Sequence, residues 1–164
     1  MTSVLISGAG PVGLTLANEL TRYGIPVRIV DKAASRTDKS KALVLWPRSL
    51  ELLEHGGYVE PFLQAGHPAK GAVLSDGSKT VAEVTLGAID TRYPYALMIA
   101  QSETERVLEE QLAARGVTVE RQVEMKSFVD RGDGIEAVLA KPDGSSETVR
   151  AGWLVGCDGA HSTT

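Results

Sequence analysis

The sequence is poor in cysteine, histidine and aromatic residues. Its 164 residues include one cysteine, three histidines and only 5% aromatic residues. A lone cysteine, Cys157, excludes an intrachain disulfide, and disulfides are typical of oxidising compartments, so we expect a cytoplasmic protein. The histidines do not have the spacing of metal ligands, so we expect no metal site. They are His55, His67 and His161.

Long apolar runs and clusters of positive charge are also missing. No apolar run approaches the roughly 18 residues of a membrane span, and the N-terminus lacks the basic start and cleavage site of a secretory signal. The net charge is −4, whereas nucleic-acid-binding surfaces carry clustered Lys and Arg. We therefore expect neither nucleic acid nor a membrane as a partner. The length and the hydrophobic fraction of 43% are typical of one globular domain.

The first thirty-one residues have the pattern of a strand–turn–helix–strand unit. We expect a strand over 4–7, a glycine-rich turn over 8–13, a helix over 14–23 and a second strand over 27–30. The turn has the G-x-G-x-x-G spacing, which in this setting is the fingerprint of a dinucleotide-binding fold. The unit therefore predicts a dinucleotide site.

Each part of the turn has its own role in that fingerprint. Gly8 permits the tight turn, Gly10 lets the backbone approach a pyrophosphate, and Gly13 lets the helix pack closely on the strand. The phosphates are expected at the helix start, around Pro11 and Val12, because unpaired N–H groups point outward there.

An acidic residue and a basic stretch follow the second strand. Asp31 lies at the expected distance of about 20 residues, where an acid accepts hydrogen bonds from ribose hydroxyls. The polar stretch 32–41 has the composition of a solvated loop. Its cations are also candidates for neutralising a diphosphate, and among them we consider Lys32 and Lys41 as cofactor ligands. Both interpretations of the stretch stay open.

The middle of the chain interrupts the alternation of strand and helix. A helix is expected to begin at Pro47, where the missing N–H costs nothing, with three leucines on its apolar side. A β-hairpin is expected within 70–96, around an Asp-Gly turn. Insertions of this kind usually help to build a neighbouring domain, so we assign 70–96 to an incomplete substrate domain. The three leucines are Leu50, Leu52 and Leu53.

The second half is expected to return to the sheet. Ser102 and Glu105 have capping-box spacing and predict a helix start just after Gln101. A strand over 117–119 is expected to pair in parallel with the first two strands. A buried strand over 153–157 should then bring Asp158 to the edge of the sheet where ligands bind. The segments between them, 123–129, 135–140 and 147–150, have the pattern of an antiparallel meander.

Three motifs together resemble one known family. They are the glycine turn with Asp31, the segment 41–51 with its Lys-Ala start and Pro-Arg-Ser-Leu-Glu end, and the Gly-Cys-Asp-Gly-Ala-His-Ser run at 156–162. The chain resembles the N-terminal part of the FAD-dependent aromatic hydroxylases, the class of para-hydroxybenzoate and phenol hydroxylases. The resemblance spans nearly the whole chain.

The resemblance implies an α/β fold with a Rossmann-like FAD/NAD(P)-binding parallel sheet, an antiparallel β-meander and an inserted β-hairpin. It implies that FAD is the cofactor and that Gln101 approaches its ribityl chain, although an exposed residue before a helix cap is equally open. Asp158 corresponds to an aspartate used for FAD and NAD(P)H, although an ordinary strand-end turn is the alternative. The implied cofactor-binding residues are Gly8, Gly10, Pro11, Val12, Gly13, Asp31, Lys32, Lys41, Gln101, Asp158 and Gly159.

The implied chemistry is reduction of FAD by NADH or NADPH and transfer of oxygen from O2 to an electron-rich aromatic ring. The flavin carries that chemistry, so we assign no catalytic side chain. Cys157 is interpreted as a small packed residue, and nothing in the sequence orients His161 as a general base.

Two departures from the family pattern bear on function. Relatives continue well beyond the Asp-Gly motif, and Lys41 stands where many of them have arginine, which can hold phosphate bidentately. We therefore expect a fragment that binds FAD weakly and hydroxylates nothing alone. Its exposed hairpin and cut sheet edge are expected to pair with another copy or with the missing C-terminal half.

Other functions compete with this interpretation. An NAD(P)-dependent dehydrogenase is disfavoured by the meander, because a simple Rossmann enzyme would keep alternating strand and helix. An NAD(P)-dependent flavoprotein reductase shares more of the layout and stays open. So does a non-catalytic dinucleotide-binding or oligomerisation module.

Overall fold

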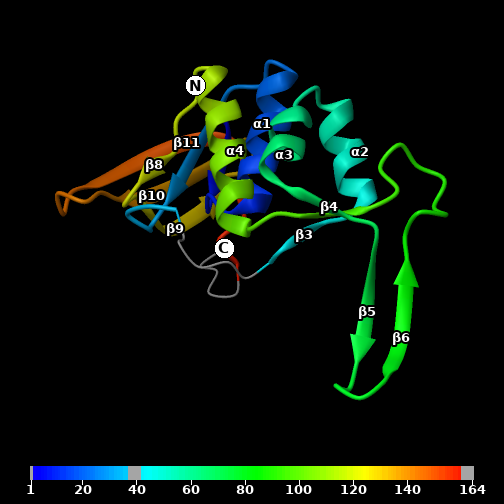
Figure 1. Ribbon diagram of the computed structural model, residues 1–164. Helices are drawn as coiled ribbons and strands as arrows, with labels where there is room; N and C mark the ends of the chain where they lie inside the picture. The colour runs from blue at the N-terminus through cyan, green and yellow to red at the C-terminus, as the bar shows by residue number, and fades with distance from the viewer. Residues whose placement is uncertain (1, 37–41, 160–164) are drawn as a thin grey trace. The chain divides into compact units, whose positions relative to one another are not determined.

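The computed structural model describes residues 2–36 and 42–159. The chain, shown in Figure 1, divides into two compact units. The first unit combines Met1–Thr37 with Glu105–Thr164, and the second unit is Asp38–Thr104. In the described ranges, no helix is long and apolar enough to cross a membrane.

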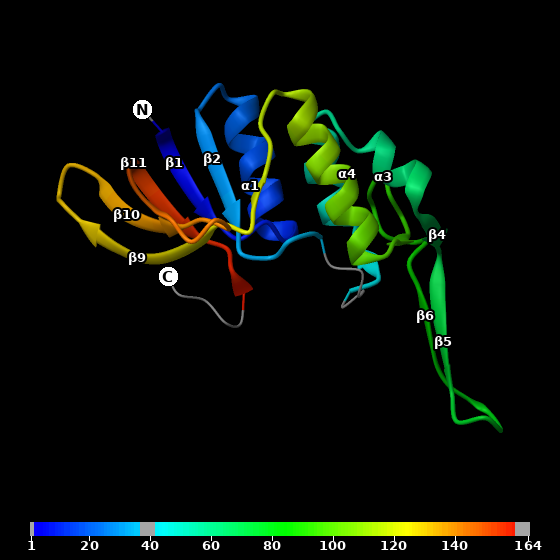
Figure 2. The same ribbon diagram turned by 90° about the vertical axis from the view of Figure 1, so that its left-hand side faces the viewer.

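The first unit contains a six-stranded sheet with the strand order β8-β2-β1-β11-β10-β9 (Figure 2). Strands β8, β2, β1 and the later part of β11 run parallel, whereas β11, β10 and β9 form an antiparallel meander. The predicted α/β fold with a parallel sheet and a meander is confirmed. The strands are β1 (Thr2–Ser7), β2 (Val27–Asp31), β8 (Glu120–Arg121), β9 (Glu124–Asp130), β10 (Ile135–Ala140) and β11 (Ser146–Gly156).

Strand β11 belongs to both parts of this sheet. Its first half pairs with β10 and its second half with β1, and Ala151 takes part in both ladders. The prediction of two separate strands here was wrong, because Gly152 continues the strand and lies close to β1: a Cβ atom there would be 3.0 Å from Ser3 O. The predicted burial of Trp153 was also wrong, since its side chain is 72% exposed.

In the first unit, helix α1 (Pro11–Arg22) packs through the fully buried Asn18 against helix α4 (Gln101–Ala114), which belongs to this unit from Glu105 on. Its Nδ2 donates to Leu14 O and to Leu108 O, both at 2.9 Å, and its Oδ1 accepts a bond from Arg115. A buried amide is costly unless its hydrogen bonds are made. Asn18 therefore fixes the two helices against each other.

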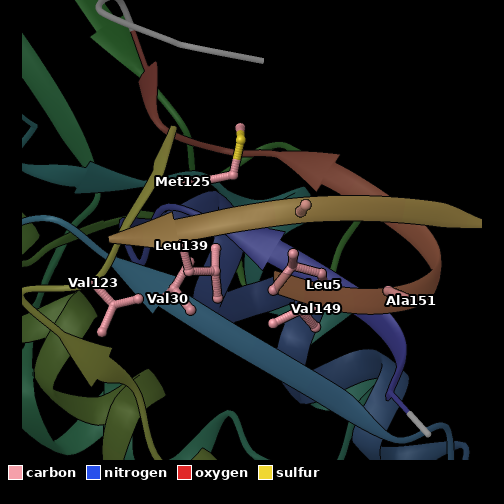
Figure 3. Close-up of a cluster of buried hydrophobic side chains, with 8 residues drawn as sticks. Leu5, Val30, Val123, Met125, Leu139, Val149 and Ala151 are labelled. Carbon is pink, nitrogen blue, oxygen red and sulfur yellow. The ribbon is translucent and has the colours of Figure 1, made fainter. Parts of the chain in front are cut away.

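An apolar cluster lies between the parallel strands and the meander (Figure 3). Residue Leu5 of β1 and Leu139 of β10 are fully buried in it. The curl of the sheet also brings the start of β9 to the end of β2, where Val123 N–H donates to Asp31 O at 3.1 Å. The cluster consists of Leu5, Val30, Val123, Met125, Ala137, Leu139, Val149 and Ala151.

Two local predictions in this unit were shifted. The strand expected over 117–119 lies at Glu120–Arg121, although it pairs in parallel with β2 as predicted. Helix α4 begins at Gln101, because Ala100 O already accepts the N–H groups of residues 103 and 104. Ser102 is therefore inside the first turn, and its prediction as the N-cap was wrong.

The second unit contains two short helices, a three-stranded antiparallel sheet of order β3-β7-β4 and a separate β5–β6 hairpin. The predicted helix start at Pro47 is confirmed. Leu50 and Leu53 are buried, but Leu52 is 54% exposed, so its predicted place on the apolar side was wrong. The elements are α2 (Pro47–His55), α3 (Glu60–Ala65), β3 (Val44–Leu45), β4 (His67–Ala69), β5 (Gly71–Ser75), β6 (Thr80–Thr85) and β7 (Ala96–Met98).

The predicted hairpin is present, with its Asp-Gly turn. Asp76 Oδ1 accepts the N–H groups of Ser78 at 2.9 Å and Lys79 at 3.0 Å, and Gly77 has the positive φ of 93° that such turns require. Every residue of β5 and β6 is exposed. The assignment of 70–96 to a substrate domain stays a prediction.

Candidate dinucleotide-binding site

The glycine turn is closed by a segment from the far end of β11. Gly8 has a φ of +103°, and a Cβ atom there would lie 2.4 Å from Cys157 O. The same junction is fastened by Gly8 N–H, which donates to Val30 O at 2.8 Å, and by Cys157 N–H, which donates to Ser7 O at 2.6 Å. Only glycine fits this position, on both conformational and steric grounds.

The other two glycines of the turn differ from each other. A Cβ atom on Gly13 would lie 2.0 Å from Gly8 O, so the absence of a side chain lets α1 approach β1. A Cβ atom on Gly10 would have no heavy atom of the described chain within 4 Å. Gly13 is thus required by the packing of the protein itself, whereas Gly10 leaves its backbone open to an external group.

The start of α1 beside Gly10 is suited to an anion. Gly10 is the N-cap, Pro11 occupies the first turn, and Leu14 N–H makes the first intrahelical bond, to Gly10 O at 3.0 Å. The N–H groups of Val12 and Gly13 precede that bond and belong to the unpaired set at a helix start. Over the described residues, no side chain caps this end, and its first turn contains no acid. The positive end of the helix dipole is therefore available.

Asp31 ends β2 and faces the glycine turn. Its Oδ2 accepts Ala9 N–H at 2.6 Å, and its Oδ1 accepts Ala33 N–H at 2.8 Å. The side chain is 17% exposed. These two bonds hold the carboxylate next to the start of α1, as the sequence predicts for a group that accepts bonds from a ribose.

A network of charged residues that the sequence did not reveal adjoins Asp31. Arg121 Nη1 lies 3.8 Å from Asp31 Oδ2, and its Nη2 donates to Glu109 Oε1 at 3.2 Å. Arg36, one of the cations of the polar stretch 32–41, pairs with Glu109 at 3.5 Å. We missed Arg121 because the strand was expected to end at residue 119. The convergence of parallel strand ends at one sheet edge is the signal that could have found it.

The Asp-Gly motif lies against the turn as well. A Cβ atom on Gly8 would be 2.6 Å from Asp158 N, so the backbone of Asp158 borders the site. Partial burial, and secondarily the charge of Asp158, raise the pKa of the Cys157 thiol, which disfavours a nucleophilic thiolate. Gly159 is exposed and has a φ of +76°.

The remaining predicted residues are more scattered. Lys32 is exposed directly after Asp31. Gln101 starts α4 in the second unit, where its backbone N–H donates to Ala42 O at 2.9 Å. Lys41 and His161 lie outside the described residues. The assignment of all these residues to cofactor binding stays a prediction.

The residues present fit the ADP portion of a dinucleotide. A diphosphate needs unpaired amides and a close approach to the backbone, which the start of α1 and Gly10 provide. A ribose needs an oriented carboxylate nearby, which Asp31 provides. Across 2–36 and 42–159, no group of three or more His, Cys, Asp and Glu side chains has the arrangement of a metal site.

Comparison with known proteins identifies the family. A family profile described as "FAD binding domain" matches residues 1–164. The chain belongs to this FAD-binding-domain family. The glycine turn, Asp31 and the Asp-Gly motif are therefore parts of a domain that binds FAD.

Several relatives of this FAD-binding domain are monooxygenases. It is 42% identical over 162 residues to the 6-methylpretetramide 4-monooxygenase of Streptomyces rimosus, covering 98% of this chain and 29% of the relative. It is 32% identical over 162 residues to the pentachlorophenol 4-monooxygenase of Sphingobium chlorophenolicum, covering 98% and 30%. The solved aklavinone-11 hydroxylase with FAD and aklavinone matches with a TM-score of 0.89 and 28% identity, covering 99% and 34%. The chain thus spans about a third of the length of these relatives.

Proposed function

We propose that this FAD-binding domain is part of a flavoprotein monooxygenase that hydroxylates an aromatic substrate with NADH or NADPH and O2. One observation carries the proposal: the start of α1, which has no side-chain cap, and the Asp31 carboxylate lie next to each other at the glycine turn, where Gly10 leaves the backbone open. The monooxygenase and hydroxylase relatives support the reaction type, and the name pentachlorophenol 4-monooxygenase supports a phenolic class of substrate.

Each residue around the turn has a distinct role in this proposal. The Val12 and Gly13 N–H groups would donate to the diphosphate of FAD, and Asp31 would accept hydrogen bonds from the ribose hydroxyls. Gly8 and Asp158 shape the floor of the site. When bound, FAD supplies the electron transfer and the activation of O2. The protein residues described above bind and orient it, and none of them is proposed to move a proton.

The cofactor roles can be tested with Gly10→Ala and Asp31→Asn. Because a methyl group at Gly10 meets nothing in the protein, G10A should keep the stability of the unaltered chain while weakening FAD at least about tenfold through a clash with the diphosphate. D31N should weaken FAD by a similar factor, because it replaces one carboxylate oxygen by a donor. Equilibrium titration followed by flavin fluorescence measures both.

The matched controls separate binding from folding. Gly13→Ala places a methyl group 2.0 Å from Gly8 O, so it should unfold the turn and lower stability by about 3 kcal/mol. Arg131→Gln removes one exposed ion pair to Glu136 in the β9–β10 turn and should leave FAD affinity unchanged. An unaltered chain that binds NADH but not FAD would rule out the flavin assignment.

The activity is a property we propose for the whole protein, not for this chain alone. The longer protein should consume O2 in the presence of NAD(P)H and a phenol, whereas the 164-residue chain should not. A longer protein that oxidises NAD(P)H without any hydroxylated product would favour a flavoprotein reductase instead. A cytoplasmic location remains our expectation, supported by the single cysteine.

The β5–β6 hairpin is the surface that we propose for docking the remainder of the protein. Val73, Leu74 and Val81 are each about 60% exposed on it, and exposed edge strands readily accept another strand. The relatives contain about twice as much additional chain, which could cover it. The alternative is that a second copy of the chain binds the hairpin, and light scattering on the 164-residue chain tests it. A dimer that dissociates on L74D substitution would show that a second copy covers β5 and β6.

A further inference from the structure

Arg121 lies beside the carboxylate that we assign to the ribose. It is the last residue of β8, and its register partner on β2 is Asp31. The Arg121 Nη1 atom lies 3.8 Å from Asp31 Oδ2, and its side chain is only 18% exposed. A cation is therefore held next to this carboxylate in a place where water screens it only partly.

A second carboxylate fixes Arg121 from the other side. Arg121 Nη2 donates to Glu109 Oε1 at 3.2 Å, and Glu109, on α4, also pairs with Arg36. The guanidinium is planar and presents several donors in a rigid arrangement, so contacts on two sides restrict it strongly. The position of Arg121 is thus set by α4 as well as by Asp31.

The charge of Arg121 matters most when a diphosphate is present. Asp31 is held near the start of α1 by Ala9 N–H and Ala33 N–H. A diphosphate bound there brings further negative charge, and its repulsion would favour a carboxylate turned away from the site. A fixed cation beside Asp31 opposes that repulsion.

We propose that Arg121, held by Glu109, is a positioning residue that keeps the Asp31 carboxylate directed at the ribose while the diphosphate is bound. The inference rests on the proposed role of Asp31 in FAD binding. Arg121 acts through Asp31 and does not itself touch the cofactor. Its effect should therefore depend on the ribose being present and on Asp31 being charged.

The test is a titration of the 164-residue chain with FAD, ADP and adenosine. R121Q should weaken FAD and ADP by the same factor, about tenfold, because both bring a diphosphate next to Asp31. It should weaken adenosine less, because adenosine has the ribose but no diphosphate to repel the carboxylate. R121K should restore only part of the affinity, since lysine keeps the charge but loses the planar fork. E109Q should give a smaller loss of about threefold, because Arg121 keeps its charge but loses one anchor. R131Q, which removes the same charge far along the meander, should bind as the unaltered chain does.

A double-mutant cycle distinguishes positioning from a structural role. In the D31N background R121Q should cause no further loss of ADP affinity, because the group it positions is gone. A loss of equal size in both backgrounds would overturn the proposal, because it would show that Arg121 acts without Asp31. A loss for adenosine as large as that for ADP would overturn it as well, because the role of the diphosphate would then be wrong. Thermal unfolding of R121Q in the absence of ligand checks that the variant is folded.

The titrations distinguish a wrong role for Arg121 from a wrong assignment of the FAD site. If the unaltered chain binds neither FAD nor ADP, the assignment of Asp31 and the role of Arg121 are both wrong. If the unaltered chain binds them and D31N weakens binding while R121Q does not, only the positioning role of Arg121 is wrong.

Discussion

The interior of the curled sheet and the β5–β6 hairpin are built from similar residues but differ in burial. Leu139 on β10 is fully buried within the cluster shared by the parallel strands and the meander, whereas Leu74 on β5 is 59% exposed. Both leucines lie in short strands bounded by turns. The difference shows that local pattern determines whether a strand forms, while segments distant in sequence determine whether it is buried.

The largest effect on stability is expected in the apolar cluster inside the curled sheet. Leu139→Ala should lower the free energy of unfolding by about 3 kcal/mol, because it removes a fully buried side chain and leaves a cavity among packed neighbours. Urea unfolding followed by circular dichroism measures the change. A loss below about 1 kcal/mol would mean that this cluster can collapse to fill the space.

The next effect concerns a charged cluster that joins three strands of the same sheet. Arg28 on β2 forms two bonds with Glu120 on β8, at 2.6 and 2.8 Å, and two with Glu147 on β11, both at 2.9 Å. Arg28→Gln would leave two partly buried carboxylates without their main partner. We expect a loss of about 2 kcal/mol at neutral pH, below the value for fully buried pairs because both carboxylates are about a third exposed.

The same cluster should make stability depend on pH. Hydrogen bonds from Arg28, and next from Lys141, lower the pKa of Glu147 from 4.5 to about 2. Because the pKa of Glu147 is lower in the folded state than in the unfolded state, its carboxylate contributes fully to the free energy of unfolding above the unfolded-state pKa. That contribution is lost as the pH falls through the folded-state pKa. The stability difference between the unaltered chain and R28Q should therefore shrink between about pH 5 and pH 2. A stability difference that stays constant between about pH 5 and pH 2 would contradict the conclusion that Arg28 lowers the pKa of Glu147.

A smaller effect of opposite sign is expected at the β8–β9 junction. Gln122 has a φ of +58° and is the one non-glycine residue of the described ranges with a positive φ. Its N–H donates to Ala33 O at 3.2 Å, which holds the backbone in this conformation. Gln122→Gly should raise stability by up to about 1 kcal/mol, because glycine adopts the left-handed region without the steric cost. A lower melting temperature for Q122G would show that the side chain contributes contacts that outweigh this cost.

The smallest effect is expected on the hairpin. Leu74→Ala should change the stability of the 164-residue chain by no more than about 0.5 kcal/mol, since the side chain is largely exposed. The same substitution in the longer protein should cost more, if the hairpin docks there as proposed. A cost in the 164-residue chain equal to that of Leu139→Ala would contradict this expectation and indicate that a second copy buries the hairpin.

The sequence predicted those features that depend on neighbouring residues. The glycine turn, the helix start at Pro47 and the Asp-Gly hairpin follow from local backbone requirements, and each is present. The burial of Leu52 and Trp153 was predicted wrongly, because helical spacing and apolar character do not reveal which side another segment covers.

In the candidate site too, the sequence predicted the parts that depend on neighbouring residues and missed those that depend on distant ones. Asp31 could be placed because its distance from the turn is fixed by the helix between them. Arg121 was missed because the end of its strand was misplaced by two residues, and the contact of Cys157 with Gly8 because it depends on where β11 enters the sheet. Those positions are set by pairing between distant segments, which leaves no periodic signal in the sequence.

The closure of the glycine turn by Cys157 affects the order in which the protein can mature. Residues 7 and 8 are translated well before the strand that completes their surroundings, which follows roughly ten seconds later at a usual rate of about 15 residues per second. Until β11 has left the ribosome, the glycine turn lacks the Cys157 backbone that closes it. We therefore expect the nascent chain to retain its cofactor only after β11 has paired with β1.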